Sequence, residues 1–227
     1  FTQTLGTSNY RAGVNAGNSI QSGGNYNVAV GDEAGTNLTT GDSNTLIGYL
    51  AGEDLVEGGN NVAIGYETMK NEDGHGKNTA VGTQALFSLN AGTDALNVAV
   101  GFQAGAGMTT GTNNTLIGSL AGDAITTGTV NVSVGTAALG SLTTASYNTA
   151  LGYAALTTNV TGAQNTAVGY SALTLATGAD NTAVGSQALS SVAAGTYNTA
   201  VGRSAGAAVT TGIENVLIGG LAGDALT

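Results

Sequence analysis

The chain lacks cysteine, proline and tryptophan, and only 5% of its 227 residues are aromatic. Without cysteine there are neither disulfides nor thiolate metal ligands, and cysteine use cannot reveal the redox compartment. Apolar residues make up 41% of the chain, and most of them are alanine, valine and leucine. Because these side chains are small, we expect them to fill a thin core.

Positive charge is also scarce. Arg11, Lys70, Lys77 and Arg203 are the four basic residues, against 14 acidic ones, and the net charge is −10. Four basic side chains are too few to neutralise the phosphates of a nucleic acid. We therefore expect neither nucleic-acid binding nor attraction to an anionic membrane surface. No apolar run approaches the roughly 20 residues that a membrane helix needs, so we expect no membrane insertion in this segment.

A short repeat built on Asn-Thr-Ala-Val-Gly dominates the chain and, with conservative replacements, occurs twelve times. Its asparagines are Asn27, Asn44, Asn61, Asn78, Asn97, Asn114, Asn131, Asn148, Asn165, Asn181, Asn198 and Asn215. The steps between them are 17 residues, except for one of 19 (78 to 97) and one of 16 (165 to 181). A period this short and regular is typical of a repeat architecture.

Three positions of the repeat are nearly fixed when each copy is numbered from its asparagine as position 1. Position 5 is always glycine, and position 8 is alanine in eleven copies, with Thr68 as the exception. Position 4 is always aliphatic and consists of Val30, Ile47, Ile64, Val81, Val100, Ile117, Val134, Leu151, Val168, Val184, Val201 and Ile218.

Positions 1 to 5 predict a short strand, because valine, isoleucine and threonine favour an extended backbone. A helix is the alternative for the Ala-Leu stretches, but the recurring glycines leave runs too short for a stable helix. A 17-residue unit of two strands and two turns cannot bury its own apolar side, so copies must stack. We therefore predict an all-β fold, a parallel β-solenoid (β-roll) of about 13 coils in a single domain, 1–227.

Stacking in register would place equivalent residues about 4.8 Å apart, so that they form ladders. We predict that the position 4 ladder lies in the core and that the position 8 alanines lie where the opposing chain passes close. Leucine or methionine at position 9, present in half the repeats, is expected to leave apolar surface for a neighbouring chain. The asparagine ladder is expected to bond to its own copies and to turn backbone, and not to a ligand.

Within the domain, residues 1–8 are predicted to be a lead-in and 9–26 a degenerate first coil that starts at Asn9. Residues 27–227 hold the twelve repeats, the last of them truncated. The second half of the coil from Asn61 to Lys77 loses the position 8 alanine and the aliphatic residue at position 12, so we predict a bulged loop there. Because both ends interrupt the pattern, we expect the chain to be a processed product or a piece of a longer protein.

The strand unit, [NS]-x-A-[VI]-G followed by x-x-A, resembles the head repeats of YadA-type trimeric autotransporter adhesins. The 17-residue form, as in NTALGYAALTTNVTGAQ from Asn148, is similar to the repeat arrays of bacteriophage tail-fibre-type proteins. This resemblance covers nearly the whole chain. It implies left-handed β-rolls, a homotrimer, and a place on a cell surface or virion. The chain departs from the adhesin heads by three extra residues per coil and contains no stalk, anchor or chaperone segment.

Residues 202–206 match the G-x-S-x-G pattern of a hydrolase nucleophile, with Ser204 at its centre. The glycines of this match belong to the repeat, and the only histidine, His75, lies eight coils away. A Ser-His pair is therefore not expected within one chain. We predict that the protein is not an enzyme, and we assign no catalytic or cofactor-binding residue and no cofactor.

Glu72, Asp73 and His75 could bind a metal, but three such residues in a glycine-rich loop are usually solvated. We therefore predict no metal site. Glu53 and Lys70 both occupy position 10 of adjacent coils, so they are expected to form a surface ion pair worth at most about 1 kcal/mol.

Taken with the resemblance, these features lead us to expect a structural or adhesive segment of an extracellular fibre or surface adhesin. Variable outward positions would offer a repetitive surface for weak multivalent contacts with a host-surface glycan or protein receptor. One alternative is the subunit of a self-assembling extracellular filament whose coils associate end to end. Another is an ice-binding solenoid, because threonine is common at position 2, although valine replaces it in five copies.

Overall fold

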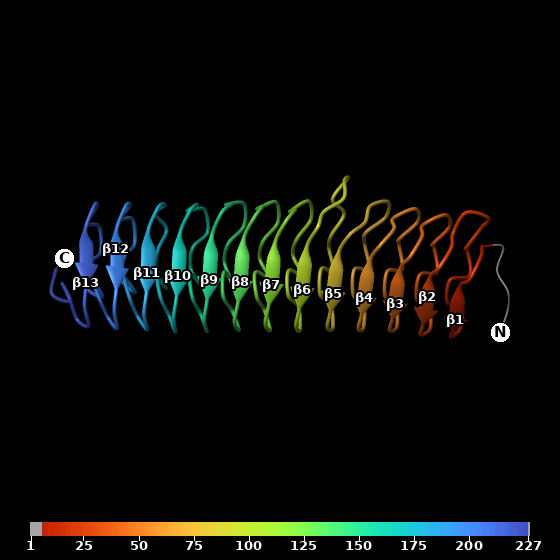
Figure 1. Cartoon of the computed structure of the whole chain (residues 1–227), viewed down its shortest axis with the longest axis horizontal. Coiled ribbons are helices and arrows are strands. Elements are labelled where there is room, and N and C mark those ends of the chain that lie inside the picture. The colour runs from red at the N-terminus through yellow and green to blue at the C-terminus, as the bar shows by residue number, and fades with distance from the viewer. Residues whose placement is uncertain (1–5, 227) are drawn as a thin grey trace. The chain divides into compact units, whose positions relative to one another are not determined.

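The computed structural model describes residues 6–226, which form an all-β parallel β-solenoid of about 12 turns (Figure 1). Residues 1–5 of the predicted lead-in and the truncated end at Thr227 lie outside the described residues. The solenoid divides into two compact units, residues up to 113 (unit 1) and residues from 114 on (unit 2).

Unit 1 has one three-residue strand in each coil, always at positions 2 to 4. These are β1 (Tyr10–Ala12), β2 (Val28–Val30), β3 (Thr45–Ile47), β4 (Val62–Ile64), β5 (Thr79–Val81) and β6 (Val98–Val100). Each strand pairs in parallel with the next, so that Ala29 lies opposite Leu46 and Leu46 opposite Ala63. Thr79 lies opposite Val98, so the 19-residue step changes only the turns.

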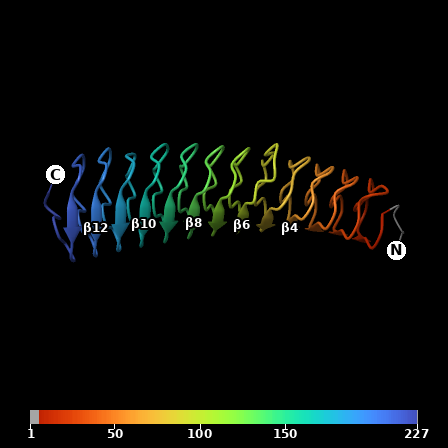
Figure 2. The ribbon, with the colours of Figure 1, turned by 45° about the horizontal axis from the view of Figure 1, so that its top comes forward.

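Unit 2 is built in the same way and contains the remaining strands. These are β7 (Thr115–Ile117), β8 (Val132–Val134), β9 (Thr149–Leu151), β10 (Thr166–Val168), β11 (Thr182–Val184), β12 (Thr199–Val201) and β13 (Val216–Ile218). Thr166 lies opposite Thr182, so the register also survives the 16-residue step. Within each unit the strands lie in a row along one side of the coils (Figure 2).

The core is lined by position 3 and not, as the sequence led us to predict, by position 4. Ala29, Leu46 and Ala167 at position 3 are fully buried, whereas Ile117 and Leu151 at position 4 are about 40% and 46% exposed. Neighbouring residues of a strand point to opposite faces, so the strand can bury either position 3 or positions 2 and 4. Because the interior is narrow, it takes the position 3 side chains, most of which are alanine, and leaves the larger, mostly β-branched position 4 side chains outside.

Position 9 also lies in the core, so the predicted spare apolar surface is wrong. Leu86, Leu139 and Leu173 at this position are fully buried. Positions 3 and 9 fill the same space, because a Cβ placed on Gly52 would lie 2.9 Å from Leu46 at position 3 of its own coil. A large residue at one position therefore requires a small one at the other. The alanines of position 8 are buried up to Ala205, in agreement with the prediction, and so is Thr68, whereas Ala222 in the last coil is half-buried.

Outside the strands the backbone repeatedly turns through the left-handed region, which explains why the second strand that we predicted per coil is not found among the described residues. Residues at positions 7, 9 and 17 have φ near +55°, as at Gln84 (56°), Leu86 (50°) and Lys77 (63°). Backbone bonds between coils nevertheless continue there, as from the Leu86 N–H to the Ala104 carbonyl, 3.0 Å. The turns outside the strands therefore also hold neighbouring coils together through backbone hydrogen bonds.

The coil from Asn61 to Lys77 keeps its place in the stack, so the predicted bulge is wrong. Thr68, Met69 and Glu72 fill the core at positions 8, 9 and 12. The projecting loop belongs to the next coil, between β5 and β6 (Figure 1), where the 19-residue step supplies two additional residues. An insertion in the turns leaves the strand register intact, which is why it is tolerated there.

Candidate functional site

The asparagine ladder joins the coils inside each unit. The backbone N–H of Asn44 donates to Oδ1 of Asn27 at 2.8 Å, and the N–H of Asn61 donates to Oδ1 of Asn44 at 3.0 Å. In unit 2 the same contact links Asn198 to Asn181 at 3.1 Å. These side chains are almost completely buried, with Asn215 of the last coil less so.

Most of these asparagines also close their own coil. Nδ2 of Asn27 donates to the carbonyl of Gly41 at 2.8 Å, and Nδ2 of Asn181 donates to that of Gly195 at the same distance. The amide thus satisfies one turn carbonyl in its own coil and one backbone N–H in the next. These bonds use both ends of the side chain, so the ladder holds neighbouring coils together.

The outward face of the strands is a different kind of surface. Positions 2 and 4 form two parallel columns of valine, isoleucine, leucine and threonine, which we call the strand face. In unit 2 its exposed members include Ile117, Val132, Leu151, Val184 and Val201. In unit 1 most members are half-buried. Apolar columns of this length are unusual on a surface that meets only water.

Aromatic residues flank the strand face. Tyr49 and Tyr66, at position 6 of adjacent coils, stack with ring centroids 5.6 Å apart, and Tyr153 and Tyr170 stack at 5.5 Å. On the other flank, Tyr147 at position 17 is exposed, as are its equivalents in two other coils. Such residues combine a large contact area with a hydroxyl group, as in many binding surfaces.

Threonines form an uninterrupted run on the strand face of unit 2. Thr149, Thr166, Thr182 and Thr199 lie in register on four successive strands. Val132 and Val216 occupy the same column on either side of them. The regular hydroxyl row is therefore confined to these four coils.

Ion pairs lie outside the strand face. Lys70 Nζ is 3.3 Å from Glu53 Oε2, which confirms the predicted ladder pair, and 3.8 Å from Glu67. Lys77 Nζ is 2.6 Å from Oδ2 of Asp94, which belongs to the projecting loop. These pairs are partly exposed, so solvent screens them and they add little to stability.

A polar group interrupts the core of unit 1 at Glu72. Its position, the twelfth of the coil, is occupied by Leu55 and Leu89 in the adjacent coils, and all three side chains are fully buried. One carboxylate oxygen, Oε1, accepts the backbone N–H of His75 at 3.1 Å. Burial raises the pKa of Glu72 above its ordinary value of 4.5 and outweighs the nearby backbone N–H groups of His75 and Ala91, which lower it.

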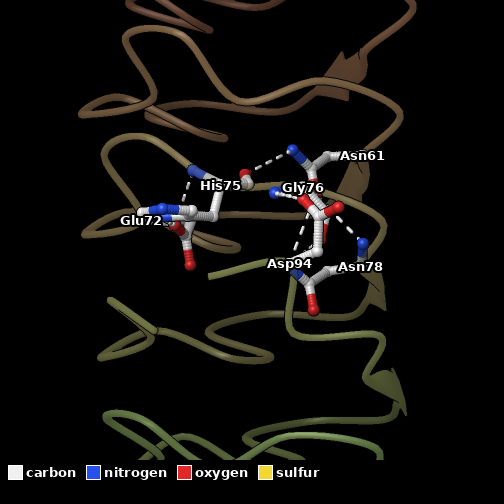
Figure 3. A network of polar contacts seen from close by, with 6 residues as sticks. All are labelled: Asn61, Glu72, His75, Gly76, Asn78 and Asp94. Carbon is white, nitrogen blue, oxygen red and sulfur yellow. Dashed lines mark hydrogen bonds and ion pairs between the residues drawn. The ribbon is translucent and has the colours of Figure 1, made fainter. Parts of the chain in front are cut away.

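Glu72, Asp73 and His75 each place one potential ligand atom within 4.8 Å of the others. Figure 3 shows Glu72 and His75 side by side, beside a second group of contacts from Asn61, Gly76, Asn78 and Asp94. In that group Asp94 Oδ1 accepts the N–H of Gly76 at 3.2 Å. The sequence had led us to expect that the three residues are solvated, but Glu72 is completely buried.

Ser204, the centre of the G-x-S-x-G match, has the left-handed backbone of every position 7 residue, with φ of 54°. Its N–H donates to the carbonyl of Ser186 in the preceding coil at 2.9 Å. The Ser204 backbone thus bonds to the preceding coil, as the equivalent Gln187 does.

Neither a protein-family model, nor a curated protein, nor a solved structure matches this chain. The structure thus supports a β-solenoid with 17-residue repeats, and no family is assigned to it. Over residues 6–226 there is no helix that is long and apolar enough to cross a membrane.

Proposed function

We propose that the protein is a structural and adhesive segment of an extracellular fibre or surface adhesin, on a cell or a virion, in which three chains associate. The observation that supports this proposal is the strand face. Its columns of aliphatic side chains are outward-facing and partly exposed, and the aromatic residues that flank them extend the apolar area. Surfaces of this kind mark contact with another protein more often than with water.

Association along the strand face would bury the position 2 and position 4 columns. Three chains arranged in this way would form a shaft whose stiffness comes from the buried asparagine ladders and the coil-to-coil backbone bonds. The resemblance to trimeric adhesin heads, carried by the repeat, supports a left-handed trimer. The outward variable positions would then present many equivalent weak contacts to a glycan or protein receptor.

Sedimentation equilibrium tests the association directly. The proposal predicts a particle with three times the 21.9 kDa mass of the chain. Leu151→Asp on the strand face should yield single chains, because three charges would be buried together. Val160→Asp is the matched control, because Val160 is 42% exposed but lies outside the strand face, so this variant should remain a trimer. A wild-type monomer would contradict the proposal, and long filaments would favour the self-assembling subunit.

The threonine run of unit 2 favours one second candidate, an ice-binding surface. Four hydroxyl-bearing side chains in register provide a short regular row. Thermal hysteresis of the wild-type protein that is lost in Thr166→Val would support this candidate. The adhesive proposal predicts no hysteresis.

A further inference from the structure

Glu72 is a fully buried carboxylate in the core of unit 1. A carboxylate in the middle of an aliphatic column is unfavourable unless something compensates its charge. The equivalent residues above and below, Leu55 and Leu89, show that the coil packs well without any polar group at this position. A role in packing alone therefore does not explain a carboxylate here.

A second buried polar residue at position 12 shows which hydrogen bonds such a side chain makes to the backbone of the turn that follows it. Asn159 in unit 2 accepts the N–H of Gly162 at 2.7 Å and donates to the Gly162 carbonyl at 2.8 Å. Glu72 reproduces the first of these contacts when Oε1 accepts the N–H of His75 at 3.1 Å. Its second oxygen, Oε2, is buried and makes no hydrogen bond within the described residues.

His75 places a second buried polar atom without a hydrogen-bond partner close to the Glu72 carboxylate. Its Nδ1 is buried, has no hydrogen-bond partner in the described part of the chain, and lies 3.8 Å from Oε1 of Glu72. That distance is too long for a hydrogen bond, so the two side chains do not satisfy each other. Asp73 adds an exposed carboxylate from the same turn. About a third of the His75 side chain is exposed, so the cluster is open to solvent on one side.

We propose that Glu72, Asp73 and His75 form a binding site for one divalent transition-metal ion, with Zn²⁺ as the best fit. One imidazole nitrogen and two carboxylate oxygens are a ligand set that suits zinc, and solvent on the open side supplies the fourth ligand. Zinc bonds of about 2 Å place neighbouring ligand atoms roughly 3.4 Å apart. The three atoms lie within 4.8 Å, so modest side-chain rotation in the exposed part of the turn closes the site.

The bound ion would compensate the buried charge. Oε1 would keep its hydrogen bond to the backbone while Oε2 coordinates the metal, so both oxygens would have a partner. The site would also tie the turn of residues 72–75 together in the coil that precedes the projecting loop. Asp94 takes no part, because it is paired with Lys77 and with the N–H of Gly76.

Isothermal titration calorimetry of the full chain with zinc sulfate tests the proposal. We expect one site per chain, and we expect both Glu72→Gln and His75→Ala to weaken binding by about tenfold or more. Glu57→Gln is the matched control, because it removes the same charge from an exposed position in the preceding coil and should bind zinc as the wild type does. Calcium should bind more weakly than zinc, since imidazole suits transition metals.

Two further readouts keep the test decisive if Glu72→Gln folds poorly. Cobalt(II) should give visible absorption of a four-coordinate site with the wild type and not with His75→Ala, whose side chain is partly exposed and whose removal spares the core. Zinc should also raise the melting temperature of the wild type and of Glu57→Gln, but not of His75→Ala. Absent binding, binding unchanged by both variants, or a preference for calcium would overturn the proposal.

Discussion

The carbonyl oxygen of Gly169 lies 2.5 Å from the point where a Cβ on Gly152 would stand. Gly152 also has φ of +136°, a conformation that side chains rarely allow. Both constraints arise from stacking, because Gly169 is the same residue one coil later. We therefore predict that Gly152→Ala lowers the free energy of unfolding by about 3 kcal/mol or more. Urea denaturation followed by circular dichroism measures this loss.

Gly220→Ala is the control for that experiment. A Cβ at Gly220 meets no atom within 4 Å, and its φ lies outside the left-handed range. This substitution should change the unfolding free energy by less than about 0.5 kcal/mol. Equal losses for both variants would mean that glycine at position 5 is not required by the neighbouring coil.

Asn181→Asp tests the buried ladder with almost no change of shape. Aspartate cannot donate to the Gly195 carbonyl, and it places a charge at a fully buried site. We predict a loss of about 3 to 5 kcal/mol at pH 7, measured by thermal or urea unfolding. The loss should shrink at acidic pH, where the carboxyl group is protonated. Asn113→Asp, at an exposed position, should be nearly neutral, and an equal effect there would argue against the ladder.

Glu72→Leu should stabilise the metal-free protein by about 1 to 2 kcal/mol at pH 7, because it restores the leucine found in the adjacent coils. The pKa of Glu72 is raised above 4.5, so the folded protein holds this proton more tightly than the unfolded chain. The contribution of Glu72 to stability is therefore present at low pH and lost as the pH rises through the raised pKa. Unfolding measured in chelator from pH 4 to 7 should show a fall in the wild type that the leucine variant lacks.

Val130→Asn should stabilise the fold by about 1 kcal/mol, since a β-branched residue with φ of 56° is strained and asparagine tolerates this conformation. Val130 is 44% exposed, so little packing is lost. Gln164→Val introduces a β-branched residue at the equivalent position of a later coil, where φ is 59°, and should destabilise by a similar amount. If the two substitutions shifted the melting temperature in the same direction, the result would contradict this explanation.

Much of the fold could be predicted from the spacing of the asparagines, because a strict period requires each coil to repeat the contacts of the last. The choice of core column could not be made in the same way. Val81 at position 4 and Ala80 at position 3 are both apolar, and hydrophobicity alone favoured the larger one. The usable signal was the size exchange between positions 3 and 9, as in Leu46 with Gly52, which shows that these two positions face each other.

The cluster around Glu72 was visible in the sequence as three potential ligands, but its burial was not. Loss of the aliphatic residue at position 12 suggested a loop that leaves the stack. In the structure Glu72 instead takes the leucine position and carries its carboxylate into the core. The register of position 12 with Leu55 and Leu89 was the available clue, because a residue in a buried column stays buried when the coils on both sides are intact.

Equivalent residues of successive coils lie in register, and paired spin labels measure this register most directly. The chain has no native cysteine, so Thr166→Cys and Thr182→Cys can be labelled together without other changes. Strands in register place the two labelled backbones about 4.8 Å apart. We predict strong dipolar broadening that persists when labelled protein is diluted with unlabelled chains. A label separation beyond about 20 Å in the diluted sample would contradict the stacked register and the functions proposed from it.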